Sequence, residues 1–501
     1  MTPEQQQEAF ERPPEGMRKV VLSTNIAEAS VTIDDVVYVI DSGVRKERSY
    51  DPETGVSSLD PKMVTRANAI QRRGRAGRVQ EGMVFHLFPS YKFGKFDEFP
   101  LPQMLTSSME EVVLQSKVIC GTSNDAISTM LQGSMAAPAE SAITNAVAGL
   151  KSMDCLTESG ELTALGRACA SIPVQPSVAK MLLVAGAFRC IKPAAVIAAF
   201  LSVKNPFQQS PGGAKDKNKK VGKEYFDKGF ASDHLTCLQA YVEWRKACRA
   251  GDGDSFCEEM GLSPETMDMA HMMANQFVNF MMEAGYDGDD AKEEDVKPVK
   301  KASDDDALIR CALTAGFMPS VVTLYKGNRS PYWWSDSNSE VYPFPGSVNK
   351  EYNVGLPDGS EWMVYSDSMV MGRGQSIMDS SLIFSTFMLL FAKAVMVDDK
   401  KGEIRFDRWW AKVDPSDPKL RQVLALRKHV LPRYKECIEG RDLALFPQDL
   451  ASEMVSVVKG SPITLNGLEP TRAHILDECP SHLRRHISVF EWTQDDGGEE
   501  D

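Results

Sequence analysis

The sequence QRRGRAGR at residues 71–78 places four arginines and two glycines in eight positions. We expect a helix over residues 65–77, in which Gln71, Arg75 and Arg78 have the i, i+4 and i+7 spacing that puts side chains on one face. The two glycines have no side chain and would let a phosphate or another backbone come close. A glutamine and two guanidinium groups on one face can bind the γ-phosphate of a nucleotide and stabilise the charge of a transition state.

An arginine-rich helix can also pair with acidic residues or lie in solvent, and for an isolated run we would prefer that interpretation. The run is not isolated, because residues 23–34 read STNIAEASVTID. This string follows an apolar run and opens a short helix, where backbone N–H groups and hydroxyls can hold phosphates. Ser, Thr and Asn are also common helix caps, which accounts for one or two of these residues but not for the whole string.

The first part of the chain alternates between strand and helix patterns. Short apolar runs at residues 20–22, 36–40 and 83–88 predict strands, and residues 45–58 predict a β-hairpin with its turn at residues 51–55. Alternation of this kind implies a mostly parallel α/β sheet.

The middle of the chain is helical in pattern. From residue 101 to about residue 286 apolar positions recur with helical spacing, interrupted by a turn and a small hairpin at residues 156–162. Helices followed by such a hairpin suggest a winged-helix module and then a helical bundle.

The last third of the chain begins with the acid-rich residues 287–306, which have no apolar periodicity and predict a linker. Short strands of a small β-barrel are then expected. The segments that carry this prediction are MVYSDSMV at residues 363–370, SLIFSTFMLLF at residues 381–391 and EIRF at residues 403–406.

Charge and cysteine usage exclude several classes of protein. The 56 basic and 70 acidic residues give a formal net charge of −14, which argues against a general nucleic-acid coat but not against a local basic patch. Residues 45–78 hold nine basic and four acidic residues, so such a patch is expected there.

None of the ten cysteines forms a C-x-x-C pair, so we expect no metal site and a reducing intracellular compartment, cytoplasmic or nuclear. The polar N-terminus has no signal-peptide pattern and the longest apolar stretch is too short for a bilayer, so no membrane is expected as a partner.

Together these patterns resemble a known family. STNIAEASVTID resembles motif V and QRRGRAGR resembles motif VI of superfamily 2 helicases, and the combination is specific to the DEAH-box and RNA helicase A-like RNA helicases. The similarity extends to other parts of the chain, namely residues 4–21, 34–51, 162–183 and 307–322.

The resemblance implies a multidomain chain that joins α/β, all-α and β parts. In chain order we expect the C-terminal part of a second RecA-like domain at residues 1–95, a winged helix at 96–165, a helicase-associated, ratchet-like helical domain at 166–286, an acidic linker at 287–306, an OB-fold barrel at 307–412, and a C-terminal helix with an acidic tail at 413–501.

The resemblance also assigns roles at the nucleotide. Gln71, Arg75 and Arg78 would contact the γ-phosphate of ATP, the two arginines as fingers, and are the expected catalytic residues. Thr32 and Asp34 would contact the ribose region of the nucleotide.

RNA is the second ligand that the resemblance implies. Ser23, Thr24 and Asn25 would grip the RNA backbone or relay between RNA and ATP, and the hairpin at residues 45–58 resembles the element implicated in strand separation. One departure is Ala29, where the family more often has Thr, and we expect it to be tolerated.

Two motifs of the family's first RecA-like domain, G-x-x-x-x-G-K-[ST] and D-E-x-H, do not occur in this sequence. The chain is therefore expected to begin within the second RecA-like domain, with Mg²⁺ supplied by the missing N-terminal helicase domain. We expect ATP as the cofactor, RNA, that missing domain and protein activators as partners, and no hydrolysis of ATP by this chain alone. The other interpretation that stays open is a non-enzymatic RNA- or partner-binding fragment.

Weaker candidates lie at the start of the expected barrel. Tyr332, Trp333 and Trp334 could stack on bases if they are exposed, although packing is the more ordinary role of such residues. Arg310 and the basic residues of the loop at residues 326–329 could touch RNA phosphates.

Overall fold

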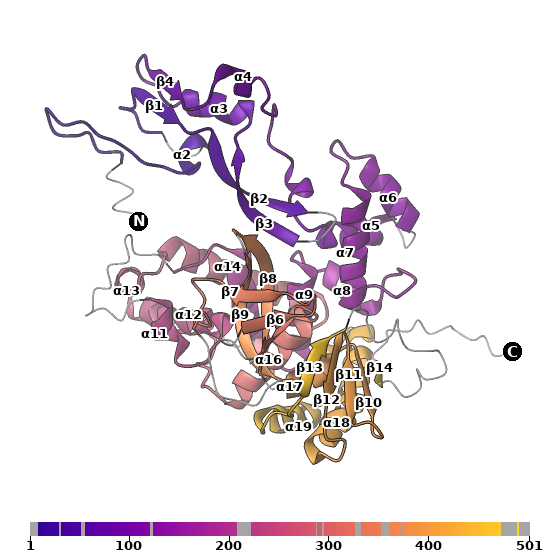
Figure 1. Ribbon diagram of the computed structural model, residues 1–501. Coiled ribbons are helices and arrows are strands. Elements are labelled where there is room, and N and C mark those ends of the chain that lie inside the picture. Colours follow the sequence, from indigo (N-terminus) through magenta and orange to yellow (C-terminus); the bar gives the residue numbers. More distant parts are fainter. Residues whose placement is uncertain are drawn as a thin grey trace. The chain divides into compact units, whose positions relative to one another are not determined.

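The residues that the computed structural model describes are 9–29, 32–51, 56–120, 124–207, 222–286, 288–292, 295–325, 332–351, 361–372, 374–471 and 488–489. They divide into two compact units (Figure 1). The first unit consists of the described residues up to Ser108 and a short piece at residues 370–372, and the second contains the other described residues from Met109 onward. Each helix in this described part of the chain is too short or too polar to cross a bilayer.

The first unit is a small α/β assembly. Strand β1 (Tyr38–Asp41) pairs in parallel with β4 (Met83–His86), and α3 (Arg66–Arg73) contacts β1 and the short helix α2 (Ile26–Ala29). A helix between two parallel strands is the arrangement that the alternating sequence pattern predicts. Next to α4 (Ser90–Phe93), a small apolar core joins Val64, Ala69 and Phe96 to Phe88 and Phe93.

The hairpin expected at residues 45–58 is present. Strands β2 (Val44–Asp51) and β3 (Val56–Met63) are antiparallel, with Val44 opposite Met63 and Asp51 opposite Val56. Residues 52–55 of its expected turn lie outside the described residues.

Two expectations for the first unit are wrong. Residues 20–22 do not form a strand, and Val20 and Leu22 are 82% and 92% exposed, because among the described residues β1 pairs only with β4 and offers this run no partner. The helix expected over residues 65–77 ends at Arg73, with Gly74 as its C-cap, and residues 75–78 continue as turns. Arg75 and Arg78 therefore do not share a regular helical face with Gln71.

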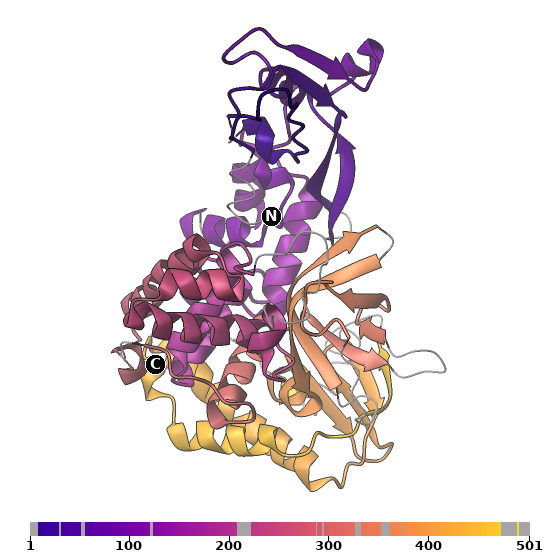
Figure 2. The same cartoon turned by 90° about the vertical axis from the view of Figure 1, so that its left-hand side faces the viewer.

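The helical part of the second unit forms a bundle, in which the magenta helices gather on one side of Figure 2. Helix α9 packs on α16 and α10 packs on α14, and ten of the 12 residues of α9 and eight of the 12 residues of α10 are buried. The helices are α5 (Glu110–Cys120), α6 (Asn124–Gln132), α7 (Glu140–Ser152), α8 (Ala164–Ala170), α9 (Pro176–Ala187), α10 (Ile191–Ser202), α11 (Lys223–Asp227), α12 (Asp233–Ala250), α13 (Gly253–Met260), α14 (Pro264–Glu283), α15 (Asp289–Lys292) and α16 (Asp304–Phe317).

The small hairpin expected at residues 156–162 is present as a single bridge between Leu156 and Leu162. The ammonium of Lys117 on α5 is buried and donates to the carbonyl of Gly160 at 2.6 Å. This bond fixes the turn of the hairpin to the helix beneath it.

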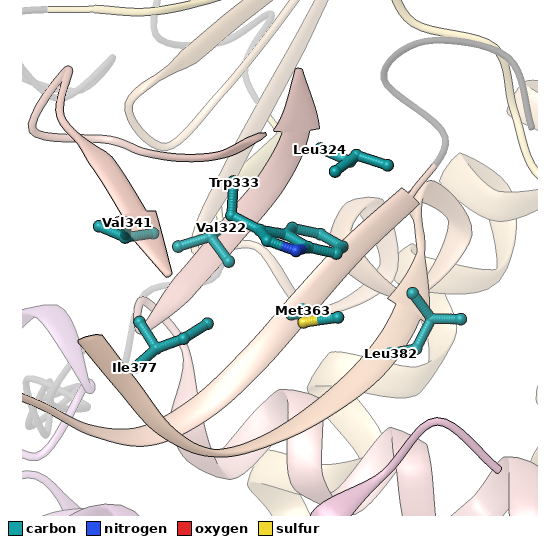
Figure 3. Packing of buried hydrophobic residues seen from close by; sticks show 7 residues of the cluster. All are labelled: Val322, Leu324, Trp333, Val341, Met363, Ile377 and Leu382. Atoms are coloured by element: carbon teal, nitrogen blue, oxygen red, sulfur yellow. The ribbon is translucent and has the colours of Figure 1, made fainter. Parts of the chain in front are cut away.

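Five strands of the second unit pair in a closed circuit. Strand β5 (Val321–Tyr325) is antiparallel to β6 (Tyr332–Ser335) and to β8 (Glu361–Met371), and β7 (Glu340–Pro343) is antiparallel to β6 and parallel to β9 (Gly374–Phe384). A pairing between β8 and β9 closes the ring, and the strands are strongly curved (Figure 2). Apolar side chains from all five strands fill the interior (Figure 3): Val322, Leu324, Trp333, Val341, Met363, Ile377 and Leu382.

A second sheet is present in the region where the sequence predicts a single barrel. EIRF at residues 403–406 is a strand as expected, β11 (Glu403–Phe406), but it pairs with β10 (Ala394–Asp398) and β12 (Trp409–Lys412) rather than with the barrel strands. Strand β13 (Asn466–Pro470) pairs with β12, and β14 (Ser488–Val489) pairs with β10.

The segment SLIFSTFMLLF is strand only in its first part. Strand β9 ends at Phe384, and α17 (Ser385–Phe391) follows directly. The guanidinium of Arg427, on α18 (Pro418–Glu439), donates to the carbonyls of Leu390 at 2.8 Å and Lys393 at 3.0 Å at the end of this helix. These tertiary contacts satisfy carbonyls that a helix end leaves open, so they override the strand preference of the local sequence.

The acid-rich segment expected as a linker is packed against helices in its described part. Val299 is buried, and its carbonyl accepts a hydrogen bond of 2.7 Å from Gln239 on α12. The amide of Ile191 donates to Asp290 at 3.0 Å. The acidic end of the segment forms the first turn of α16, where carboxylates favour the helix dipole.

A buried carboxylate ties the bundle to the barrel within the second unit. Asp233, the first residue of α12, accepts from the Ser347 hydroxyl at 2.6 Å and from the amides of Val348 and Ser380 at 3.0 Å each. The ammonium of Lys223 pairs with it at 2.6 Å. Burial alone would raise the pKa of Asp233, but Lys223 and these donors outweigh burial, and the pKa lies below its ordinary value.

Replacing this carboxylate tests the connection. We expect Asp233→Ala to lower the free energy of unfolding of the second unit by about 3–5 kcal/mol, because it removes the buried carboxylate that the largely buried ammonium of Lys223 and several donors share. Urea unfolding followed by circular dichroism measures the change. The control Asp399→Ala, in the exposed turn between β10 and β11, should change it by less than about 0.5 kcal/mol. Equal effects of the two variants would contradict the role of Asp233.

Candidate functional site

The arginine-bearing helix α3 begins at a well-defined cap. The hydroxyl of Thr65 accepts from the amide of Asn68 at 3.3 Å, and the amide of Thr65 donates to the side-chain oxygen of Asn68 at 3.2 Å. This reciprocal capping box satisfies two of the donors that a helix start leaves open. The amide of Arg66 donates to the carbonyl of Asp97 at 2.8 Å, which fixes the same end to a later loop.

Arg72 is the centre of a charged network on this helix. Its Nε donates to Glu28 at 2.9 Å and its Nη1 donates to Asp41 at 2.8 Å, and both carboxylates are buried. Burial acts to lower the pKa of Arg72, but the hydrogen bonds and charges of Asp41 and Glu28 outweigh it, and the pKa lies above its ordinary value. Asn68 donates its amide to the other oxygen of Glu28. One guanidinium therefore joins α2, β1 and α3.

Asp41 closes the same network on the strand side. It accepts from the amide of Gly43 at 2.9 Å, and its second oxygen lies 3.2 Å from Nδ1 of His86. Gly43 has φ = 70°, in the left-handed region, and a side chain there would collide with the ring of Phe88. The turn after β1 consequently depends on glycine. The imidazole of His86 also packs on Phe88, with ring centroids 4.7 Å apart.

The two expected arginine fingers follow the end of the helix. The amide of Arg75 donates to the carbonyl of Arg72 at 3.1 Å, so the chain continues in a tight turn. Arg75 is half-buried, and burial followed by the like charge of Arg78 lowers its pKa, partly offset by Glu28. Arg78 is exposed and donates from Nη1 to the hydroxyl of Thr32. This hydrogen bond joins the two segments that the sequence singles out.

The remaining expected residues lie around this network. Ser23, Thr24 and Asn25 are exposed and lead into α2, with the carbonyl of Asn25 accepting from the amide of Glu28 at 3.0 Å. Because Glu28 holds Arg72, the start of α2 is fixed relative to α3.

Asp34 and Gln71 are exposed, and neither takes part in the hydrogen-bond network described above. The structure therefore brings Thr32 and Arg78 together and leaves these two accessible beside them. Across the described ranges, no group of three or more His, Cys, Asp or Glu side chains could hold a metal ion.

Sequence reasoning missed the residues that position the site. Glu28, Asp41, Asn68 and Arg72 were given no role, although Glu28 and Arg72 lie inside the two conspicuous strings. The opposite charges of Glu28 and Arg72 could have indicated an ion pair between the two strings. Gly82 was also missed, and a side chain there would collide with the carbonyl of Ala76.

Comparison with known proteins places this site in a family. The model of the helicase conserved C-terminal domain matches residues 1–80, and that of the ratchet-like helicase associated domain (HA2) matches residues 175–237. The DExH-box ATP-dependent RNA helicase DExH1 of Arabidopsis thaliana is 37% identical over 399 residues, which are 79% of this chain and 39% of that protein. The chain is homologous to the C-terminal region of DEAH/DExH-box helicases.

Other DEAH/DExH-box helicases are similar over the same extent. The ATP-dependent DNA/RNA helicase DHX36 of Homo sapiens is 33% identical over 419 residues, 81% of this chain and 40% of that protein. DExH3 of Arabidopsis thaliana is 33% identical over 410 residues, 81% of this chain and 33% of that protein. The chain spans less than half the length of each of these relatives. Its two domain matches belong to the C-terminal region of DEAH/DExH-box helicases, and this confirms the resemblance drawn from STNIAEASVTID and QRRGRAGR.

Neighbouring arginines of α3 offer a matched test of the network. We expect Arg72→Ala to lower the free energy of opening of the first unit by about 3 kcal/mol, because it leaves Glu28 and Asp41 as buried carboxylates without their cation. Arg73→Ala removes an exposed charge from the same helix turn and should change it by less than about 0.5 kcal/mol. Amide hydrogen exchange at residues 25–29 and 66–73 measures the difference. Similar protection in the two variants would show that the network does not hold α2 to α3.

Proposed function

We propose that this chain acts as the C-terminal portion of an ATP-dependent RNA helicase and supplies the arginine side of its ATP site. The observation that carries the proposal is the hydrogen bond from Arg78 to Thr32, which joins the motif V-like and motif VI-like segments. The printed names of the relatives DExH1 and DExH3, which describe ATP-dependent RNA helicases, support it.

The charges of the site fit a polyphosphate. Arg75 and Arg78 are close enough for the charge of Arg78 to lower the pKa of Arg75, so the two guanidinium groups repel each other. An anion between them would relieve that repulsion and accept charge-assisted hydrogen bonds from both. In the proposed site they contact the γ-phosphate of ATP together with Gln71, while Thr32 and Asp34 contact the ribose region.

RNA binding is proposed at the start of α2. Ser23, Thr24 and Asn25 present hydroxyl and amide groups on an exposed segment, and such groups commonly contact the phosphate backbone of nucleic acids. The ion pairs of Glu28 and Arg72 would connect their position to that of the arginine segment.

The described residues contain no cluster of carboxylates that could bind Mg²⁺. The sequence contains neither G-x-x-x-x-G-K-[ST] nor D-E-x-H, and the described carboxylates form no metal-binding group. We propose that a first RecA-like domain supplies the Mg²⁺ ligands and the remaining catalytic groups.

The domain boundaries in this proposal follow the family resemblance. Residues 1–95 belong to the second RecA-like domain, 96–165 to a winged helix and 166–286 to the ratchet-like domain. We propose that strands β5 to β9 form an OB-fold, because five strands closed into a barrel, with the β7–β9 pair parallel and the β5–β6, β5–β8 and β6–β7 pairs antiparallel, agree with that architecture.

A non-enzymatic RNA-binding module is the second candidate function. The observation that favours it is the lack of the two phosphate- and metal-binding motifs in all 501 residues. The continuous reading frame upstream of Met1 distinguishes the candidates, because only a helicase requires it to encode both motifs.

ATP hydrolysis provides the biochemical test. We expect the purified 501-residue chain to bind single-stranded RNA but to hydrolyse no ATP, with or without RNA. In a protein extended by a first RecA-like domain, Arg75→Ala or Arg78→Ala should lower kcat by on the order of 10³-fold, whereas the control Arg73→Ala should leave kcat nearly unchanged. RNA-stimulated hydrolysis by the 501-residue chain that Arg75→Ala abolishes would refute the proposed division of the site.

A further inference from the structure

Residues 74–82, between α3 and β4, carry both of the proposed arginine fingers, and we call them the finger loop. The loop is fixed at its start, because the amide of Gly74 donates to the carbonyl of Ile70 at 3.0 Å. It is fixed at its end, because the amide of Met83, the first residue of β4, donates to the carbonyl of Val37 at 2.8 Å. The two arginines therefore lie on a short connection that is held at both ends.

The middle of the finger loop packs against its own end. Ala76 lies between the two arginines in the chain and is 2% exposed. A Cβ placed on Gly82 would lie 1.8 Å from the carbonyl oxygen of Ala76 and 2.5 Å from its carbonyl carbon, and real Cβ atoms essentially never come within 3.0 Å of such atoms. Only a glycine at position 82 permits this approach of two backbone segments.

The two glycines inside the string QRRGRAGR are less constrained by the surrounding chain. A Cβ at Gly74 would lie 3.4 Å from the carbonyl oxygen of Gln71, and a Cβ at Gly77 would meet none of the described atoms beyond its chain neighbours within 4 Å. The glycine that the backbone packing requires is therefore Gly82, which lies outside the string.

The backbone of Ala76 connects the positions of both arginines. Its amide donates to the carbonyl of Arg73 at 3.2 Å, so the chain makes a tight turn directly after α3. Two residues later, Arg78 donates to the hydroxyl of Thr32. A displacement of Ala76 would therefore act on Arg75 before it and on Arg78 after it.

We propose that Gly82 is a positioning residue for Arg75 and Arg78, because its missing side chain lets the start of β4 support Ala76 between them. The inference rests on the role proposed above for the two arginines at ATP and names a further residue for that site. Gly82→Ala would force the two backbone segments apart by about 1 Å, and a misplacement of that size can slow a reaction by about 10²-fold.

The methyl group of Thr32 reports the position of Arg78 in the 501-residue chain. Nuclear magnetic resonance of chains with labelled threonine methyl groups gives its chemical shift, and Thr32→Ser, which lacks the methyl group, identifies the resonance. Arg78→Ala defines the chemical shift without the guanidinium donor. We expect Gly82→Ala to move the resonance toward that value, because the hydrogen bond from Arg78 is displaced.

Gly94→Ala is the matched control. Gly94 is the C-cap of α4 in the same unit and has φ = −63°, and a Cβ there would make an ordinary contact of 3.7 Å with the carbonyl oxygen of Tyr91. This variant should leave the Thr32 resonance where it is in the wild-type chain.

Amide hydrogen exchange at residues 66–73 verifies that α3 stays folded in Gly82→Ala. If Gly82→Ala unfolds the first unit, Ala76→Gly loosens the same contact without adding an atom. It should move the Thr32 resonance in the same direction.

ATP hydrolysis distinguishes a positioning role from a merely structural one. In a protein extended by a first RecA-like domain, Gly82→Ala should lower kcat by about 10²-fold and change KM for ATP much less, because the proposed fingers act on the charge of the transition state. In a variant with alanine at both Arg75 and Arg78, adding Gly82→Ala should lower kcat no further, because residues that act as a unit are not additive. Gly94→Ala should leave kcat nearly unchanged.

Two results would overturn the inference while leaving the proposed function intact. One is a wild-type Thr32 resonance in folded Gly82→Ala or, where that variant unfolds, in Ala76→Gly. The other is a full further loss of kcat when Gly82→Ala is added to the variant that lacks Arg75 and Arg78, because Gly82 would then not act through the arginines. If replacing the two arginines left kcat unchanged, the proposed function would fail together with the inference.

Discussion

The double ion pair of Arg72 is the constraint on which the first unit depends. A guanidinium can donate in two directions from a rigid plane, and here one direction meets Glu28 and the other meets Asp41. A lysine could satisfy only one of these carboxylates with the same geometry. Because both carboxylates are buried, removing their cation would leave two unpaired charges, and this ties α2, β1 and α3 into one arrangement. Arg75 and Arg78 lie two and five residues after the end of the helix that Arg72 holds in place.

The charge distribution explains how an acidic chain can carry a basic segment. The net charge of −14 describes the whole sequence, whereas residues 45–78 hold nine basic and four acidic residues. Within that stretch Arg72 is paired with two carboxylates, while burial and then the like charge of Arg78 lower the pKa of Arg75. The arginine segment therefore contains one cation, Arg72, that is paired within the fold, followed by two arginines, Arg75 and Arg78, whose like charges lie close together.

The sequence predicted those features whose signals are local. The β2–β3 hairpin, the parallel β1–β4 pair and the site strings depend on residues that are near in the chain or on recognisable motifs. Helix α17 was missed because its end is held by Arg427, 36 residues away from Phe391, and because the hydroxyl of Ser385 donates to the carbonyl of Ile463 at 2.6 Å. The assignment of EIRF to a separate sheet depends on β13, which follows only after two further helices, α18 and α19 (Gln448–Lys459). Periodicity within a window carries no information about such distant partners.

The orientations of the neighbouring residues Trp333 and Trp334 also could not be predicted from the local sequence. Two identical side chains in one strand must point to opposite faces, so one of them fills the barrel and the other meets the surface. Composition does not show which of the two indoles faces the barrel interior, because their orientation depends on the register of the strand pairing. That register, with Leu324 opposite Trp333 and Thr323 opposite Trp334, turns Trp333 inward. A shift by one residue would exchange the two roles, so the pairing of β5 with β6 is what gives the outward-facing indole of Trp334 its partners Tyr325 and Asn338.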